Sequence, residues 1–210
     1  MKIVVISDTH GQHRAKSLKL SEGDMIIHAG DISSKGTLNS VVDFLDWFSG
    51  LSYKYKIFIA GNHDFLFEKD TPENIKKLIP ENVIYLNDSK VIIEGINIWG
   101  SPIQPLFYNW AFNRKRGEEI KKHWDLIPDD TDILITHGPA FNILDKTVRN
   151  DLAGCEDLLK KIKIVKPKYH IFGHVHEAYG EIEEFGVKFI NASLMTERYK
   201  LKNKAVVINY

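Results

Sequence analysis

Short apolar runs rich in β-branched residues recur along the chain, and helical patterns lie between several of them. The runs occupy residues 2–7, 24–30, 55–61, 96–101, 132–138, 168–174, 187–193 and 205–210. Uninterrupted apolar runs of this length predict strands that are buried on both faces. Because such strands alternate with helices, the sequence predicts an α/β protein.

Helical spacing of apolar residues is found in segments 37–50, 71–80, 117–127 and 155–167. In the second of these, Thr71 fits the N-cap position, Pro72 the first helical position and Pro80 the stop. The segment 101–117 differs, because it combines two prolines and four aromatic residues without a clear period. We expect a long ordered loop there, and long loops in compact domains are often functional.

Length and charge limit the class of protein further. A chain of 210 residues predicts one domain, residues 1–210, with one substantial core. Lys+Arg and Asp+Glu both number 28, which argues against nucleic acid or an anionic membrane as the partner. No apolar run reaches the length of a membrane span. The single cysteine and the lack of a signal-peptide pattern lead us to expect a cytoplasmic protein.

Polar side chains with metal-ligand chemistry follow five of the predicted strands directly. They are Asp8 and His10, then Asp31, then Asn62, His63 and Asp64, then His137, and finally His174 and His176. In α/β sheets the carboxyl ends of strands gather at one edge, so residues far apart in the sequence converge there. Carboxylate, imidazole and amide oxygen are the ligands of a divalent first-row metal ion. No cysteine is present in these motifs, which argues against a thiolate metal site.

The motif Gly-His-x-His at residues 173–176 is unusual for this composition. With 14 Gly and 9 His in 210 residues, it is expected only ~0.025 times by chance. Residues two apart on an extended segment point to the same side, so we expect His174 and His176 both to face the site. The motif therefore predicts metal ligands in preference to two surface imidazoles.

The order Asp-x-His, Gly-Asp, Gly-Asn-His-Asp, His and Gly-His-x-His resembles the calcineurin-like metallophosphoesterase superfamily. Further segments resemble its metallophosphoesterase-domain-containing branch of class III phosphodiesterases: WGSP (99–102), THGP (136–139), GC (154–155), FGHVHEAYG (172–180) and INAS (190–193). The resemblance implies a four-layer α/β/β/α sandwich of two mixed sheets flanked by helices. The strand count is compatible with that fold and also with a single doubly wound sheet.

The resemblance also implies two divalent metal ions. Asp8, His10, Asp31 and His176 would hold the first, and Asp31, Asn62, His137 and His174 the second. Asp31 would bridge them, and a water between the ions would become the hydroxide nucleophile. Manganese is the expected metal, and iron, zinc and cobalt are compatible. In the family pattern His63 is not a ligand but a general acid or electrostatic clamp, which Asp64 would orient.

Other candidates concern the substrate. We expect His13 to reach the phosphate, with a solvent-exposed loop residue as the alternative. Asn109, Trp110 or Phe112 would form a wall for a nucleobase, unless the aromatic residues only pack the loop. His28 and His170 lie inside apolar runs and are expected to be core residues. The alternative for His28 is that it supports the metal ligand Asp31 from behind.

These observations favour an enzyme, a metal-dependent phosphodiesterase acting on a small phosphodiester such as a cyclic nucleotide. A phosphomonoesterase is the first alternative, because the same metals serve both bonds. A nucleotide-binding regulator with weak activity is the second. The stretch GDISSKG (30–36) lacks the arginine of the protein-phosphatase motif, which argues against a protein substrate. The sequence predicts no particular oligomeric state.

Overall fold

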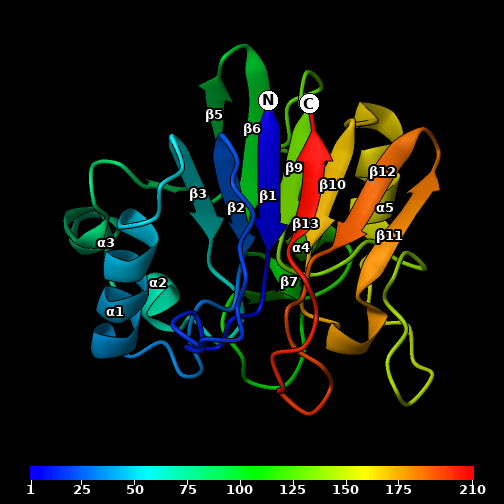
Figure 1. Cartoon of the computed structure of the whole chain (residues 1–210). Helices are drawn as coiled ribbons and strands as arrows, with labels where there is room; N and C mark the ends of the chain where they lie inside the picture. Colours follow the sequence, from blue (N-terminus) through cyan, green and yellow to red (C-terminus); the bar gives the residue numbers. More distant parts are fainter.

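Two mixed β-sheets face each other in the computed structural model, which describes all residues from Met1 to Tyr210 (Figure 1). The five-stranded sheet has the order β13 (Val206–Asn209), β1 (Lys2–Ile6), β2 (Met25–Ala29), β3 (Tyr55–Ile59) and β4 (Ile84–Tyr85). The six-stranded sheet has the order β11 (Gly180–Glu184), β12 (Val187–Asn191), β10 (Tyr169–Phe172), β9 (Ile133–Thr136), β6 (Ile96–Ser101) and β5 (Ser89–Ile93). The predicted sandwich of two mixed sheets is confirmed, and a single sheet is excluded.

Most neighbouring strands run parallel. In the five-stranded sheet β1, β2, β3 and β4 are parallel, and only β13 at one edge is antiparallel. In the other sheet β6, β9, β10 and β12 are parallel, and the edge strands β5 and β11 are antiparallel. The carboxyl ends of β1, β2 and β3 therefore lie at one end of their sheet, as the arrowheads in Figure 1 show.

Alternate residues of each inner strand belong to different cores. Ile3 and Val5 of β1 belong to a cluster of 19 buried residues that includes apolar residues of both sheets. Val4 and Ile6 belong to a cluster of 31 buried residues that includes the apolar faces of the helices. Because successive side chains of a strand point to opposite faces, continuous apolar runs are needed to supply both cores.

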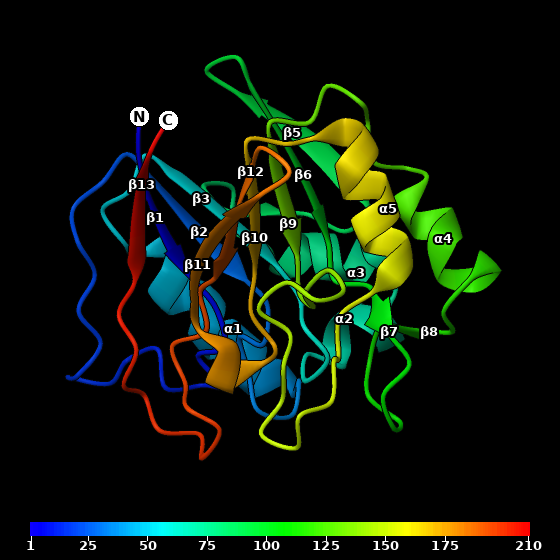
Figure 2. The same ribbon diagram turned by 90° about the vertical axis from the view of Figure 1, so that its right-hand side faces the viewer.

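Helices cover the outer faces of the sheets. They are α1 (Leu38–Ser49), α2 (Leu66–Lys69), α3 (Pro72–Leu78), α4 (Glu118–Trp124) and α5 (Glu156–Val165). The 3₁₀ turn η1 (His176–Ala178) lies instead in the segment that follows β10. Figure 2 shows α4 and α5 together outside the six-stranded sheet. As predicted, Thr71 caps α3 by accepting a hydrogen bond from the Asn74 backbone N–H, and Pro72 is its first residue. None of the helices has the length and apolar character that a membrane span requires.

Several parts of the fold differ from the sequence predictions. The edge strands β4, β5 and β11 were not among the predicted strands, because β4 has only two residues, β5 has a run of only three apolar residues and β11 has a single apolar residue. The segment 101–117, predicted to be a loop, contains the two-stranded ribbon of β7 (Gln104–Pro105) and β8 (Asn113–Arg114).

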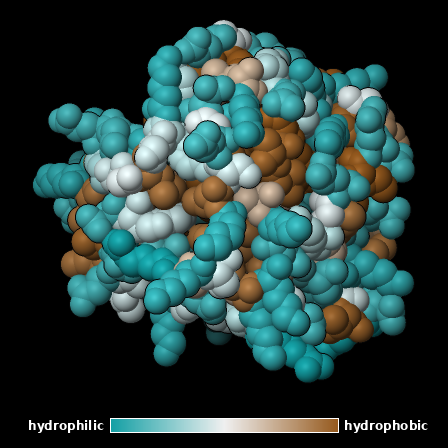
Figure 3. Space-filling model, viewed as in Figure 1, coloured by the Kyte–Doolittle hydropathy of each residue, from teal (hydrophilic) through white to brown (hydrophobic).

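The turn between β7 and β8 exposes Leu106, Phe107 and Tyr108, whose side chains are large and apolar. The surface is otherwise mixed: Figure 3 shows separate apolar patches among hydrophilic residues on the face seen in Figure 1. Of these side chains, Phe107 lies near His174, with ring centroids 6.3 Å apart.

Candidate metal centre

The carboxyl ends of the two sheets meet directly. The Ser7 backbone N–H, just after β1, donates to the carbonyl of Ala192 just after β12, and the Leu194 N–H donates back to the Ser7 carbonyl. The loops that follow β1, β2, β3, β9 and β10 therefore face one another. All seven side chains predicted as metal ligands lie in these loops: Asp8, His10, Asp31, Asn62, His137, His174 and His176.

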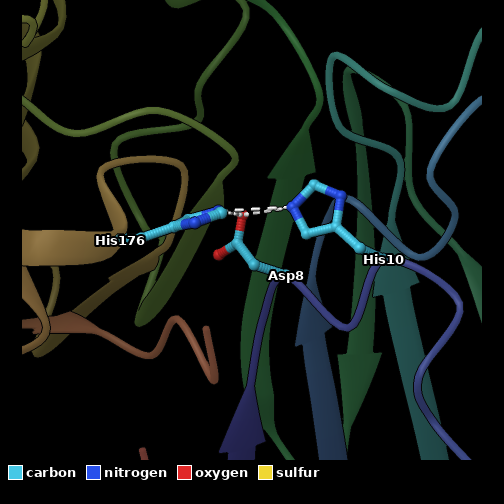
Figure 4. Close-up of side chains that lie close together, drawn as sticks. All are labelled: Asp8, His10 and His176. Atoms are coloured by element: carbon cyan, nitrogen blue, oxygen red, sulfur yellow. Dashed lines mark hydrogen bonds and ion pairs between the residues drawn. The ribbon is translucent and has the colours of Figure 1, made fainter. Parts of the chain in front are cut away.

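Three of these side chains form one group, shown in Figure 4. The Nε2 atoms of His10 and His176 are 3.2 Å apart, and His176 Nε2 lies 3.3 Å from Asp8 Oδ1. The three residues come from the loops after β1 and β10, and all three are buried. Their ligand atoms lie close enough together to hold one metal ion.

A second group lies on the other side of Asp31. The Oδ1 atom of Asn62 is 2.9 Å from His137 Nε2 and 2.8 Å from His174 Nδ1. Asp31 Oδ2 lies 3.4 Å from His137 Nε2 and 3.5 Å from His10 Nε2. A single carboxylate oxygen thus lies within 3.5 Å of an imidazole nitrogen from each group.

The local backbone is strained where it presents these side chains. Asp8, His10, Asp31 and His174 all have positive φ angles, between 43° and 66°. Non-glycine residues seldom adopt this left-handed conformation, and such strain concentrates at functional sites. A glycine is required nearby, because a Cβ atom on Gly173 would lie 2.1 Å from Asp8 Oδ2. The sequence motifs therefore include glycine for steric reasons.

The prediction that His174 and His176 lie on an extended segment and point to the same side is wrong. They do not lie on an extended segment, because His174 is left-handed with φ 66° and η1 begins at His176. The turn directs them to different groups, His174 toward Asn62 and His176 toward Asp8.

Backbone carbonyls fix the orientation of two imidazoles. His137 Nδ1 donates to the Ala29 carbonyl at 3.0 Å, and His176 Nδ1 donates to the Thr196 carbonyl at 3.1 Å. When each ring is neutral, this hydrogen bond leaves the Nε2 lone pair directed toward the acceptor oxygens of Asp31, Asn62 and Asp8. Histidine ligands of metals are commonly held this way by their other ring nitrogen. Acceptor atoms that converge in this manner fit a bound cation.

The buried carboxylates make the site favourable for positive charge. Burial alone would lower the pKa of His137, but the charge and hydrogen bond of Asp31 outweigh it and raise the pKa to about 9. Burial would raise the pKa of Asp31, yet His137 and His10 hold it well below its usual value. A proton on His137 and a metal ion beside it would therefore compete for the same carboxylate.

Residues 1–178 match the family model described as calcineurin-like phosphoesterase. The chain belongs to this family. It is 38% identical over 231 residues to human metallophosphoesterase domain-containing protein 1, covering 99% of this chain and 70% of the relative. It is 35% identical over 219 residues to a UPF0046 protein of Caenorhabditis elegans, covering 99% and 74% of the two chains.

Solved structures of low identity share the fold of this calcineurin-like phosphoesterase. The phosphopantetheinyl hydrolase of Mycobacterium tuberculosis superimposes with a TM-score of 0.68 at 16% identity, covering 94% of this chain and 90% of that one. The protein TT1561 of Thermus thermophilus gives 0.58 at 14% identity, covering 90% and 88%. The family assignment makes the chain a metal-dependent phosphoesterase, and the ligand groups described above are the candidates for its divalent ions.

His63 lies at the edge of this phosphoesterase site. Its Nδ1 donates to the Ser34 carbonyl at 2.9 Å, and its Nε2 lies 4.0 Å from Asp31 Oδ2. Its backbone N–H donates to Asp31 Oδ1 at 2.8 Å. The imidazole is therefore oriented toward the metal ligands, and with His10 and Asp31 it forms a further group whose ligand atoms lie close enough together to hold an ion.

Asp64 does not orient His63 by direct contact, because its carboxylate forms no hydrogen bond or ion pair with the His63 ring. Asp64 is buried and accepts hydrogen bonds from the backbone N–H groups of Gly61, Ile32 and Ser33, and from the Ser33 hydroxyl, at 2.8 to 3.1 Å. It joins the loop after β3 to the loop after β2, and the Ser34 carbonyl orients His63 instead.

Two of the substrate candidates are placed differently from the predictions. His13 is neither exposed nor directed at the site, because its ring is buried against Trp47 and its Nε2 lies 2.9 Å from Asp43 Oδ2. Phe112 is also buried and belongs to the core, so it packs the loop and cannot form a substrate wall.

The other two candidates remain accessible. Trp110 is partly buried and lies against His63, and Asn109 is exposed beside it. Substrate contact by these residues stays a prediction.

Tyr199 was not found from the sequence, although it borders the first group. Its ring centroid lies 4.9 Å from that of His10 and 5.0 Å from that of His176. It lies in the loop between β12 and β13, where no motif with metal-ligand chemistry occurs. The sequence of this loop contains only a tyrosine among mainly polar residues, which does not indicate a position beside metal ligands.

Proposed function

We propose that this phosphoesterase is a phosphodiesterase that binds two divalent ions, with manganese as the expected metal and iron, zinc and cobalt compatible. The ligands of the first ion are Asp8, His10, Asp31 and His176, and those of the second are Asp31, Asn62, His137 and His174. The observation that carries the proposal is the position of Asp31 Oδ2 between His10 Nε2 and His137 Nε2. The buried acceptor atoms on both sides of it suit two cations better than one.

Two ions held there would acidify a water molecule to give the hydroxide nucleophile and would offset charge on the phosphoryl oxygens. The chain itself provides the acid. Because His63 Nδ1 is occupied by the Ser34 carbonyl, Nε2 is the nitrogen that can carry a proton toward the leaving oxygen. His63 therefore serves as the general acid, and a proton held at Nε2 also attracts the phosphoryl oxygens.

The charges around the site favour a diester over a monoester. No lysine or arginine forms a hydrogen bond or ion pair with the seven proposed ligands or with His63. A phosphate monoester carries nearly two negative charges near neutral pH, whereas a diester carries one. A site whose positive charge comes from the ions and one histidine suits the diester.

Trp110 indicates the nature of the leaving group. Its indole packs against the His63 imidazole, with ring centroids 4.1 Å apart, so we infer that a group attached to the oxygen that His63 protonates lies next to this ring. An aromatic group stacks well there, which supports a nucleotide diester such as cyclic AMP or cyclic GMP.

The test is turnover by protein stripped with EDTA and reloaded with one metal at a time. Cyclic AMP and bis(4-nitrophenyl) phosphate would be compared with AMP and 4-nitrophenyl phosphate, with Asp31→Asn as the inactive control. We expect metal-dependent hydrolysis, faster for the diesters. Faster turnover of both monoesters than of every diester would overturn the diester assignment. Nucleotide binding without turnover under any metal would indicate a regulator.

A further inference from the structure

Tyr199 is positioned to touch substrate, although it belongs to neither ligand group. Its side chain is 50% exposed, and its ring lies edge-on to the imidazoles of His10 and His176. Its hydroxyl forms no hydrogen bond within the chain, whereas the hydroxyl of the neighbouring Tyr179 donates to the Lys204 carbonyl. An aromatic ring half open to solvent is thus placed beside the first group of ligands.

The loop that carries Tyr199 is built into the site. Thr196 N–H donates to the Lys200 carbonyl and Tyr199 N–H donates to the Thr196 carbonyl, both at 2.9 Å, so the turn is closed on itself. The same Thr196 carbonyl accepts from His176 Nδ1. Tyr199 itself is left-handed with φ 54°, a conformation that costs a tyrosine energy and needs support from its surroundings. The backbone that carries the ring is therefore held in place by the fold.

Trp110 and Tyr199 lie against different histidines. The Trp110 ring centroid is 4.1 Å from His63. Tyr199 is 6.3 Å from His63 but only 4.9 Å from His10. A diester has two organic groups on phosphorus, one that leaves and one that is retained. The leaving group must lie at His63, and so beside Trp110.

We propose that Tyr199 forms the wall for the retained organic group of the diester and is a specificity-determining residue of the site. The proposal rests on the proposed function, because it requires the leaving oxygen to lie at His63. It assigns the two aromatic rings to the two groups of the substrate. A monoester, which has no retained group, gains nothing from Tyr199.

Three substrates with the same leaving group test this division. Bis(4-nitrophenyl) phosphate retains an aryl group, methyl 4-nitrophenyl phosphate retains a methyl group, and 4-nitrophenyl phosphate retains none. The measured quantity is the ratio of kcat/KM for the first to kcat/KM for the second, taken on one preparation of manganese-loaded enzyme. Lost metal or unfolded protein cancels in this ratio. Tyr199→Ala should lower the ratio roughly 2- to 12-fold, mainly through KM, which is the usual range for an aromatic contact.

The controls separate the ring from the hydroxyl and from the fold. Tyr199→Phe keeps the ring and should keep the ratio. Phe185→Ala is the matched control, because Phe185 is also about half exposed, at 46%, and left-handed, with φ 56°, but lies at the turn between β11 and β12. It should leave the ratio unchanged.

Two results would overturn the proposal while leaving the phosphodiesterase assignment intact. One is an unchanged ratio for Tyr199→Ala, with or without a fall for Phe107→Ala, whose ring lies near His174. The other is a fall of the ratio for Tyr199→Phe as large as that for Tyr199→Ala, which would assign the effect to the hydroxyl and not to the ring. Absence of metal-dependent turnover by the unmodified enzyme would instead overturn the proposed function.

Discussion

The indole of Trp110 lies against the imidazole of His63, with ring centroids 4.1 Å apart and planes inclined by 31°. Trp110 also contacts Phe65, at 5.9 Å between centroids. The aromatic segment after β7 therefore reaches the histidine that we propose as the acid. In the proposed mechanism, this one side chain would both restrain His63 and border the leaving group.

Trp110→Ala should raise KM for all three 4-nitrophenyl esters alike, because they share the leaving group. An aromatic contact of about 0.5 to 1.5 kcal/mol corresponds to a roughly 2- to 12-fold rise. Trp110→Phe keeps an aromatic ring and should raise KM less than Trp110→Ala does. Steady-state kinetics on the three esters would measure this. A lowered kcat with unchanged KM would show instead that Trp110 only restrains His63.

His63→Asn should cost rate but not metal, since the proposed ligand sets of both ions are complete without His63. General acid catalysis is worth about 10²- to 10⁴-fold, so turnover of cyclic AMP should fall by that order. The loss should be much smaller for bis(4-nitrophenyl) phosphate, whose leaving group needs no proton. Equal losses on both substrates would favour an electrostatic clamp, and loss of bound metal would contradict both roles.

Asp64→Asn should destabilise the fold and leave the dependence on the leaving group unchanged. The amide would direct N–H groups at the donors of Gly61, Ile32 or Ser33, and each buried donor left unpaired costs about 1 to 3 kcal/mol. Chemical denaturation would measure the loss of unfolding free energy. Unchanged stability together with slower turnover of cyclic AMP, but not of bis(4-nitrophenyl) phosphate, would show that Asp64 acts through His63.

The buried histidines His28 and His170 should make the fold sensitive to acid. Burial lowers the pKa of each to about 3, and their Nε2 atoms lie 3.0 Å from Thr9 Oγ1 and 2.8 Å from Thr136 Oγ1. Because both are neutral in the folded chain and protonate at about pH 6.5 when unfolded, their contribution to stability is complete above that pH. It is lost as the pH falls toward 3.

The expected slope is about 1.4 kcal/mol per pH unit for each histidine between about pH 6 and pH 4. The double variant His28→Gln, His170→Gln keeps an N–H donor for each threonine but cannot titrate. Urea unfolding of metal-free protein at several pH values should therefore give it a shallower pH dependence than the unmodified chain. Identical slopes would contradict the assignment.

Much of the fold was predictable because its inner strands are continuous apolar runs that supply two cores. The edge strands β5 and β11 have only three and one apolar residues respectively, so they lack that pattern and were not predicted. The proposed ligands were predictable because chemistry at strand ends converges in a parallel sheet. Contacts between loops were not predictable: neither Tyr199 beside His10 nor the Ser34 carbonyl beside His63 leaves a signal in the local sequence.

The central claim is that Asp31 lies between two metal ions, and metal stoichiometry tests it most directly. Protein saturated with manganese and freed of excess metal should contain two ions per chain by elemental analysis. Asn62→Ala and His174→Ala should each reduce the content toward one, because both residues belong to the second group. A content of one ion in the unmodified protein, unchanged in both variants, would contradict the account.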